Sequence, residues 1–414
     1  MLSQKKIVIG LFGFGVVGEG LYKVLKQTPS LNAQIKKVCI KNIEKKREAP
    51  TSLFTTNKNE LLFDKEINVI VEVINETEAA FEIVSIALLN GKHVVSASKK
   101  MLAEHLEELL ILQQQTGKSL LYEAAACASI PVIRNLEEYY DNDLLHSIQA
   151  IVNGSSNFIL TKMFDDKLDF SDALKQAQQL GFAESDPALD IEGYDALHKW
   201  VLLLNHAYGI VTTPDEIVFS GITNITAQDA AFAKEHGFEI KLVAQAKKLT
   251  TGKVAAFVLP QFVKKDEPLS FVKNEYNGVV IESAFADKQF FYGKGAGSFP
   301  TASAVLSDIA ALRYNYKYEY KKLYQQPLKL TDNFFVKAYI SYEDESHLPL
   351  FINELENKIK LFAGRNTLKV NLPFSLLQES DWWKKNNISL ILFPTAVVEN
   401  KKQITSGKTI QEFA

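Results

Sequence analysis

The stretch KIVIGLFGFGVVGEGLYKVL, from Lys6 to Leu25, decides the fold of this chain. A short apolar run rich in β-branched residues leads into Gly13-Phe14-Gly15-Val16-Val17-Gly18, and helical spacing follows. G-x-G-x-x-G between a strand and a helix is the setting in which the pyrophosphate of a dinucleotide lies against the helix N-terminus. The first glycine allows the tight turn, the second admits the pyrophosphate and the third lets the helix pack on the strand. We therefore predict a nucleotide-binding βαβ unit; a glycine-rich turn without a ligand is the alternative.

The alternation of strand and helix patterns continues downstream. Strands alternating with helices predict an α/β fold with a doubly wound, Rossmann-like parallel sheet. Ligands bind such sheets beyond the carboxyl ends of the strands, which here places Thr77 and Lys99 near the cofactor. An exposed residue that merely opens a helix is the alternative for Lys99. The expected strands are 36–40, 67–74, 93–96 and 119–122, and the expected helices are 78–89 and 101–115.

The residues after the second strand bear on which dinucleotide is bound. NAD-binding folds usually place an acidic residue there, where it accepts hydrogen bonds from the ribose hydroxyls. Here the strand runs into Lys41 and Asn42, and the nearest acid is Glu44. Because a cation can attract a ribose 2′-phosphate, the sequence favours NADP(H), with NAD(H) as the alternative. A solvated basic loop is the interpretation without a ligand.

Composition narrows the class of protein. A chain of 414 residues with 47% hydrophobic and 23% charged residues is typical of a globular protein with two or three domains. A net charge of −3 provides no basic field for nucleic acid or a membrane surface. Cys39 and Cys127 give no disulfide framework, and no apolar leader precedes the first strand. We expect a cytoplasmic protein without nucleic-acid or membrane partners.

A second stretch, GFAESDPALDIEGYDALHK at Gly181 to Lys199, gathers carboxylates in a loop that leads into a helix carrying one lysine. Carboxylates can hold an ammonium group and a lysine can move a proton, which suits a small amino-acid-like substrate. A solvated acidic loop, with Asp195 and Lys199 as an ordinary i,i+4 ion pair, is the alternative. We expect the helix from Asp195 to about Asn205 to be amphipathic.

The turn at Asn153 and Gly154 opens another helix, and its polar residues either cap that helix or line a substrate cleft. With this segment the chain resembles the homoserine dehydrogenases, in pieces that occur in the family's order and cover roughly residues 5–315. The acidic stretch is the most specific piece, and G-x-G-x-x-G is the least. The pieces are GLFGFGVVG (10–18), GKHVVSASK (91–99), NGSSNFIL (153–160), GFAESDPALDIEGYDALHK (181–199) and GKGAGSFPTASAVLSDI (293–309).

The resemblance implies a reversible NAD(P)-dependent interconversion of L-homoserine and L-aspartate 4-semialdehyde, in threonine and methionine biosynthesis. Lys199 matches the family's lysine proposed to exchange a proton with the substrate oxygen, and Lys99 the lysine between substrate and nicotinamide. Further substrate-binding residues are implied at Glu184, Asp190, Asp195 and Asn153. The implied cofactor contacts are Gly13, Phe14, Gly15, Val16, Val17, Gly18, Lys41, Thr77, Lys99 and Gly297.

A sodium ion is also implied, held by the backbone carbonyls of Glu123, Ala126, Ala128 and Ile130. Here the chain departs from the family, whose loop usually has glycines where this chain has Cys127, Ala128 and Ser129. The departure matters because a backbone without glycine resists curling around a cation. A second departure is Ser98, where the family has asparagine before the first lysine.

The implied reaction requires a particular protonation state of the proton-exchanging lysine. In the oxidising direction the base must be a neutral amine, which a lysine becomes only if its pKa falls from about 10.4 towards the working pH. Burial and a second cation lower such a pKa, whereas an adjacent carboxylate raises it. We therefore expect the Asp195 carboxylate to be directed mainly at the substrate ammonium.

The chain divides by pattern into three parts. We predict a dinucleotide-binding domain at 1–134, closed by 298–320, a substrate and dimerisation domain at 135–297, and a small α+β module at 330–414. Strands are expected at 334–342, 368–377 and 388–398, with a helix at 348–359. The module resembles an effector-binding ACT domain loosely, because Glu343-Asp344-Glu345-Ser346 replaces the usual Asp-x-x-Gly turn.

By the same resemblance we expect a monofunctional enzyme that forms a homodimer or higher homo-oligomer. Two rival functions remain open from the sequence. One is an NADP-dependent dehydrogenase of another amino-acid semialdehyde, and the other is a non-catalytic NADP-binding sensor. The presence of both lysines together with Glu184 and Asp195 favours the enzyme over the sensor.

Overall fold

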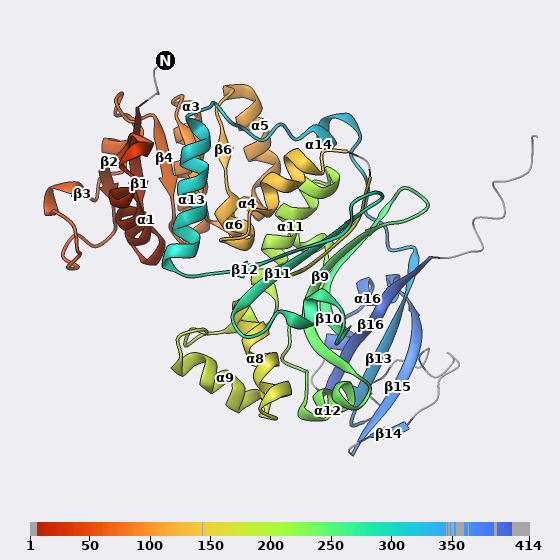
Figure 1. Cartoon of the computed structure of the whole chain (residues 1–414). Coiled ribbons are helices and arrows are strands. Elements are labelled where there is room, and N and C mark those ends of the chain that lie inside the picture. Colours follow the sequence, from red (N-terminus) through yellow and green to blue (C-terminus); the bar gives the residue numbers. More distant parts are fainter. Residues whose placement is uncertain are drawn as a thin grey trace, which may run out of the picture.

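The computed structural model describes residues 6–142, 144–344, 346, 348, 352, 360–362, 364–384 and 387–399. Its N-terminal part is a six-stranded parallel sheet in the order β3-β2-β1-β4-β5-β6 (Figure 1). The order reverses between β1 and β4, and dinucleotides bind at such a switch point. The predicted Rossmann-like sheet is confirmed. Its strands are β1 (Ile7–Phe12), β2 (Ala33–Cys39), β3 (Phe54–Thr55), β4 (Val69–Glu72), β5 (His93–Ser96) and β6 (Leu120–Leu121).

The helices of this part follow the predicted pattern with one correction. The single helix predicted at 101–115 is two helices, because His105 leaves the helical region at φ −118° and ψ 24°. Its ring stacks on Phe81 of the neighbouring helix, with ring centroids 4.0 Å apart. The helices are α1 (Val16–Gln27), α2 (Asn59–Leu62), α3 (Thr77–Leu89), α4 (Lys99–Glu104), α5 (Leu106–Thr116), α6 (Glu123–Cys127), α7 (Val132–Arg134) and, returning from far along the chain to pack on α1, α13 (Ser298–Leu312).

The rest of the chain is built on a ten-stranded sheet in the order β12-β11-β7-β9-β10-β16-β13-β15-β14, with β8 beside β10. The helices α8, α11 and α12 pack against β9. The strands are β7 (Leu145–Ile151), β8 (Val218–Phe219), β9 (Phe238–Lys248), β10 (Val254–Lys264), β11 (Tyr276–Ser283), β12 (Asp287–Lys294), β13 (Phe334–Tyr342), β14 (Lys360–Phe362), β15 (Arg365–Pro373) and β16 (Ile388–Glu399). The helices are α8 (Gly154–Asp165), α9 (Phe170–Gln179), α10 (Ala188–Ile191), α11 (Tyr194–Tyr208), α12 (Ala227–Glu235), α14 (Lys321–Gln325) and α16 (Ser375–Gln378).

Helix α11 joins the two parts, and it differs from the amphipathic helix that we predicted. Every residue from Asp195 to Tyr208 is buried. The helix lies between α4 and α6 of the nucleotide-binding part and β7, β9 and β10 of the large sheet (Figure 1). Its polar residues therefore face other parts of the protein rather than bulk water. As a result, Asp195 and Lys199 are only 5% and 7% exposed.

The C-terminal strands add to the same large sheet. Residue Gln261 of β10 pairs with Leu392 of β16, and β13 lies beyond it. The strands predicted at 334–342 and 388–398 are confirmed, whereas the one predicted at 368–377 ends at Pro373 and α16 follows. Most of the helix predicted at 348–359 falls outside the described residues. Among the described helices, none has the length and apolar character needed to cross a bilayer.

Candidate active site

The glycine-rich turn after β1 has the geometry of a dinucleotide cradle. Gly13 has φ +95°, and a Cβ there would lie 2.7 Å from the Val73 carbonyl oxygen. A Cβ on Gly18 would lie 2.3 Å from the Gly13 carbonyl oxygen, so α1 packs directly on the turn. Nothing lies within 4 Å of a Cβ built at Gly15, which leaves the backbone at the start of α1 open. These residues fit a pyrophosphate, which α1 would meet with its positive end.

The other residues of the fingerprint differ in what they offer. The Phe14 ring points inward and packs edge-on against Tyr22 and Phe54, so only its backbone is left to contact a cofactor. Val16 is 67% exposed, and Val17 is half-buried. At these predicted positions, backbone groups rather than side chains are therefore available to contact the cofactor.

A buried carboxylate, Glu72 at the end of β4, organises the sheet edge where the nicotinamide is expected. It is 0% exposed and accepts hydrogen bonds from the hydroxyls of Ser96 at 2.6 Å and Ser98 at 2.7 Å. Burial raises the pKa of Glu72, although these hydrogen bonds oppose the shift. The network fixes the loop that ends at Lys99. Glu72 is not among the predicted site residues, and its only signal in the sequence is a carboxylate inside an apolar strand.

Asp195 lies at the centre of the site, between the two predicted lysines. Its Oδ1 is 2.5 Å from Lys99 Nζ, and its Oδ2 is 2.7 Å from Lys199 Nζ. The Lys199 ammonium also donates to the Val152 carbonyl oxygen at 2.7 Å. Lys99 keeps 41% of its side chain exposed, whereas Lys199 is enclosed. The carboxylate thus binds both lysines, and the expectation that it is directed mainly at a substrate ammonium stays a prediction.

Asn153 connects the acidic loop to helix α8, because its side chain both caps the helix and contacts two carboxylates. Its Oδ1 accepts from the Ser156 backbone N–H at 2.7 Å. Its Nδ2 donates to Asp190 Oδ1 at 2.7 Å and to Asp195 Oδ2 at 2.8 Å. The capping interpretation left open by the sequence is confirmed, and the role of Asn153 in lining a substrate cleft stays a prediction. The structure brings Asn153, Asp190, Asp195, Lys99 and Lys199 into one cluster.

The charges of this cluster shift one another's protonation. Asp195 raises the pKa of Lys99 most, and the more distant Asp190 and Glu184 add to the effect. Burial by itself would raise the pKa of Asp195, but the two ammonium groups outweigh it and hold that pKa well below its usual range. Burial and the charge of Asp195 raise the pKa of Asp190. The site therefore holds two lysines around one firmly ionised carboxylate.

Two neighbouring residues, Glu184 and His198, add little to the charge of the cluster. Glu184 is exposed, and its backbone carbonyl accepts from Gln178 at 3.0 Å, so its carboxylate borders the cluster rather than joining it. Burial lowers the pKa of His198, next to Lys199 in α11, to about 4. His198 is thus neutral at neutral pH and adds no third cation.

The segment that returns from the large sheet reaches the cofactor cradle. Gly297 has φ +115° and precedes α13, and the Ser298 hydroxyl donates to the Val16 carbonyl oxygen at 2.8 Å. A Cβ on Gly20 would lie 2.6 Å from that hydroxyl oxygen. The start of α13 is therefore fixed against the start of α1, where the resemblance places Gly297 beside the cofactor.

At the adenosine end, Lys41 follows β2 and forms an ion pair with Glu76, which precedes Thr77 and α3. Both side chains are mainly exposed, at 79% and 56%. The acidic residue that was missing from the end of β2 thus arrives from the neighbouring loop. Lys41 can turn to a 2′-phosphate, and Glu76 can accept from ribose hydroxyls.

The predicted ion loop makes a tight turn. The backbone N–H of Ile130 donates to the Cys127 carbonyl oxygen at 3.1 Å, and Ala128 between them has φ 45° and ψ −105°. This conformation normally calls for glycine. The backbone therefore curls here without the family's glycines. In this turn the Ile130 carbonyl also accepts from the Val132 N–H at 2.8 Å.

The turn gives a stability prediction. Ala128→Gly should raise the free energy of unfolding by about 1 kcal/mol, because it relieves a positive φ that costs an L-residue about 1–3 kcal/mol. Ala126→Gly, inside α6, is the matched control and should lower it by about 1 kcal/mol. Urea unfolding of the two variants checks this, and a loss of stability in both would contradict the strain at Ala128.

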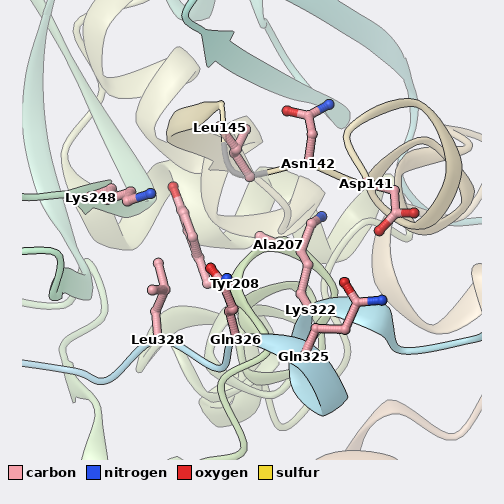
Figure 2. A pocket seen from close by; sticks show the side chains of 10 residues that line it. All are labelled: Asp141, Asn142, Leu145, Ala207, Tyr208, Lys248, Lys322, Gln325, Gln326 and Leu328. Carbon is pink, nitrogen blue, oxygen red and sulfur yellow. The ribbon is translucent and has the colours of Figure 1, made fainter.

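A cavity of about 250 Å³ lies away from this cluster, at the end of α11 that carries Tyr208 (Figure 2). Lys322 contributes to its wall and donates to the carbonyl oxygens of Leu136 at 2.7 Å and His206 at 2.8 Å. Burial lowers the pKa of Lys322 to about 8. No predicted site residue lines this cavity, so it is separate from the candidate active site.

Known proteins are similar to this chain in sequence and in fold. Residues 13–123 match the family described as homoserine dehydrogenase, NAD binding domain, and residues 131–310 match the family described as homoserine dehydrogenase. The homoserine dehydrogenase of Bacillus subtilis is 37% identical over 321 residues, which are 75% of this chain and 74% of that protein.

Solved structures agree with these sequence matches. A crystal structure of a homoserine dehydrogenase from Thiobacillus denitrificans is similar at 28% identity and a TM-score of 0.81, over 94% of this chain and 98% of that one. A hyperthermophilic archaeal homoserine dehydrogenase in complex with NADPH is similar at 27% identity and a TM-score of 0.65, over 76% and 99%. With the dinucleotide cradle and the lysine–carboxylate cluster in place, the chain belongs to the homoserine dehydrogenase family.

Proposed function

We propose that the chain interconverts L-homoserine and L-aspartate 4-semialdehyde, with Lys199 as the group that exchanges the proton of the substrate hydroxyl. The observation that carries this is the Asp195 carboxylate shared by Lys99 and Lys199, at the carboxyl edge of the Rossmann sheet. A nicotinamide dinucleotide would be held at Gly13 to Gly18 and would supply the hydride.

The residues of the cluster divide the remaining tasks. Asp195, Asp190 and Glu184 carry the negative charge that a substrate ammonium needs, and Asn153 fixes the first two by hydrogen bonds. A substrate ammonium that binds Asp195 competes with the lysines for its oxygens. Lys199 would then keep its hydrogen bond to the Val152 carbonyl, and another hydrogen of its ammonium group would be able to reach the substrate oxygen. Proton exchange needs such direct contact.

We further propose that NADP(H) is preferred, on the ground that Lys41 ends β2. Lys41→Glu should lower kcat/KM for NADPH about tenfold and for NADH much less, because a charge-assisted hydrogen bond to phosphate contributes about 1.5–3 kcal/mol. Lys45→Glu, in the same basic loop, is the matched control and should affect both cofactors little. Steady-state kinetics with both cofactors decide the matter, and an equal loss with NADPH and NADH would remove Lys41 from the phosphate site.

Three further features belong to the proposal. A sodium ion would be held by the backbone carbonyls of Glu123, Ala126, Ala128 and Ile130. The tight turn at Ala128 supports this ion site. The ion would have a structural role, because α6 packs on α11.

A homo-oligomer is supported by exposed aromatic side chains at the edge of the large sheet, Phe285, Phe290 and Tyr292. A cytoplasmic location is supported by two cysteines that are both free.

One experiment tests the function directly. Purified protein is given L-aspartate 4-semialdehyde with NADPH or NADH, in sodium and in potassium buffers. Turnover that favours NADPH supports the substrate and the cofactor together, and a difference between the salts supports the ion. Absence of turnover in a protein that still binds NADPH would shift the assignment to another amino-acid semialdehyde, and then to a sensor.

A further inference from the structure

Asn277, near the start of β11, has a buried side chain without hydrogen-bond partners. The residue is 0% exposed, and neither its Oδ1 nor its Nδ2 is bonded to any group in the described part of the chain. Leaving a buried polar group unpaired costs about 1–3 kcal/mol, so folded proteins seldom do so without a reason. The amide is available for a further hydrogen-bonding partner.

The backbone of the segment Gly293–Gly297 lies close to this amide, and Gly293 pairs with Asn277 in the ladder of β11 and β12. A Cβ built on Gly295 would lie 1.9 Å from Asn277 Nδ2 and 2.3 Å from Oδ1, so only glycine lets the segment approach so closely. This segment leaves β12 and reaches Ser298, whose hydroxyl is bonded to Val16 beside the dinucleotide cradle. It therefore connects the substrate sheet directly to the cofactor site.

The other side of Asn277 is rigid. Asn157 Nδ2 donates to the carbonyl oxygens of Asn274 at 2.8 Å and Tyr276 at 3.3 Å, which fixes the chain just before Asn277. Lys241, 1% exposed, donates to the Val272 carbonyl oxygen at 2.6 Å in the same loop. On the other side, Gly293 and Lys294 pair with β11 in the same ladder, so the part of the glycine-rich segment that can adjust is Gly295 to Gly297, beyond the end of β12.

We propose that Asn277 is a positioning residue that fastens the Gly293–Gly297 segment when the dinucleotide binds. The dinucleotide shifts the backbone of Gly295 to Gly297, before the fixed Ser298, and the Asn277 amide then accepts from a backbone N–H and donates to a backbone carbonyl of the segment. The register that pairs Gly278 with Ile151 also brings Asn277 alongside Val152, whose carbonyl holds Lys199. Fastening the segment thus closes the cofactor site next to the proposed proton-exchanging lysine. The inference rests on the proposed dinucleotide binding but does not require turnover.

The test compares the stability of the free protein with its affinity for NADPH. Asn277→Leu, close in size and apolar, should leave the thermal midpoint of the free protein unchanged or raised, since it removes the unpaired groups. It should weaken NADPH binding about tenfold, measured by calorimetric titration, because one or two hydrogen bonds of the bound state are lost. Gln245→Leu is the matched control: Gln245 on β9 has a buried unpaired Oε1 far from the segment, and its loss should not change NADPH affinity.

An unchanged NADPH affinity in Asn277→Leu would overturn the inference, whatever the stability of the free protein. A second variant covers the case in which Asn277→Leu does not fold. Asn277→Ala should also weaken NADPH binding, because it removes the same amide without adding bulk near Gly295. An NADPH affinity of Asn277→Ala equal to that of the wild type would also overturn it. A wild-type protein that binds NADPH without turnover would fail the proposed function alone, whereas one that does not bind NADPH would fail both.

Discussion

Lys199→Ala should lower turnover about 10³-fold, in the range lost with a general acid–base group, and leave NADPH affinity within about twofold. The separation follows from the geometry. Lys199 Nζ is bonded to Asp195 and Val152 in the substrate part of the site, whereas the cradle at Gly13 to Gly18 is formed by another element. Steady-state kinetics and NADPH titration measure the two effects.

Lys199 is buried, so the variant needs a check on folding. Lys199→Met keeps an apolar stem of similar length and should show the same loss of turnover with less disturbance of α11. Lys100→Ala is the matched control, because Lys100 is adjacent to Lys99 but is 51% exposed and pairs with Glu104. Turnover retained in either Lys199 variant, or lost together with NADPH binding, would show that the lysine has another role.

The parts of the fold that the sequence predicted are those fixed by local geometry. The G-x-G-x-x-G turn needs glycine at Gly13 and Gly18 whatever surrounds it, and the run of apolar strands needs covering helices. The break at His105 could not be predicted, because no glycine or proline marks it and the ring on which His105 stacks belongs to another helix. Tertiary contacts decide such details.

The burial of α11 could not be predicted either, because it also depends on tertiary contacts. Asp195, His198 and Lys199 look like a solvated face in sequence, but they are buried among other elements. A buried helix carries polar residues where they form a functional site. At such a helix, the sequence pattern that normally marks an exposed face gives a wrong prediction of burial.

The site residues were predicted as types, but not in their mutual arrangement. The sequence identified Lys99, Asn153 and Asp195 on separate segments, and the structure joins them through hydrogen bonds and ion pairs. The Val152 carbonyl that binds Lys199 could not be predicted, because any residue type provides a backbone oxygen. The shared carboxylate could not be predicted either, since it depends on α4 and α11 meeting.

Asp195→Asn should lower kcat/KM about 10³-fold and the free energy of unfolding by about 3 kcal/mol, the latter being the lower end of what breaking a buried ion pair costs. An asparagine has one acceptor oxygen, whereas Asp195 now accepts from Lys99, Lys199 and Asn153. Two ammonium groups would then face each other without a carboxylate between them. A substrate ammonium would lose its main partner as well.

The loss of stability should depend on pH, in a direction that identifies its cause. In the wild type Asp195 is the main group that raises the pKa of Lys99. Without it, repulsion and burial push a lysine pKa below its unfolded value of about 10.4, so the unfolded chain binds more protons and stability rises with pH. Asp195→Asn should therefore approach wild-type stability from pH 7 to about pH 9.5. In the wild type the raised pKa of Lys99 gives the opposite trend, a loss of stability only above about pH 10.

Urea unfolding at both pH values measures this dependence, with Asp186→Asn as the matched control. Asp186 lies in the same loop but is exposed, and its Oδ1 accepts from the Ala188 N–H. Its replacement should leave both activity and the pH profile of stability near those of the wild type. A deficit in Asp195→Asn that is the same at both pH values would mean that lost packing, and not two unpaired lysines, destabilises the variant. In that case the shared carboxylate would not be what holds Lys99 and Lys199 together.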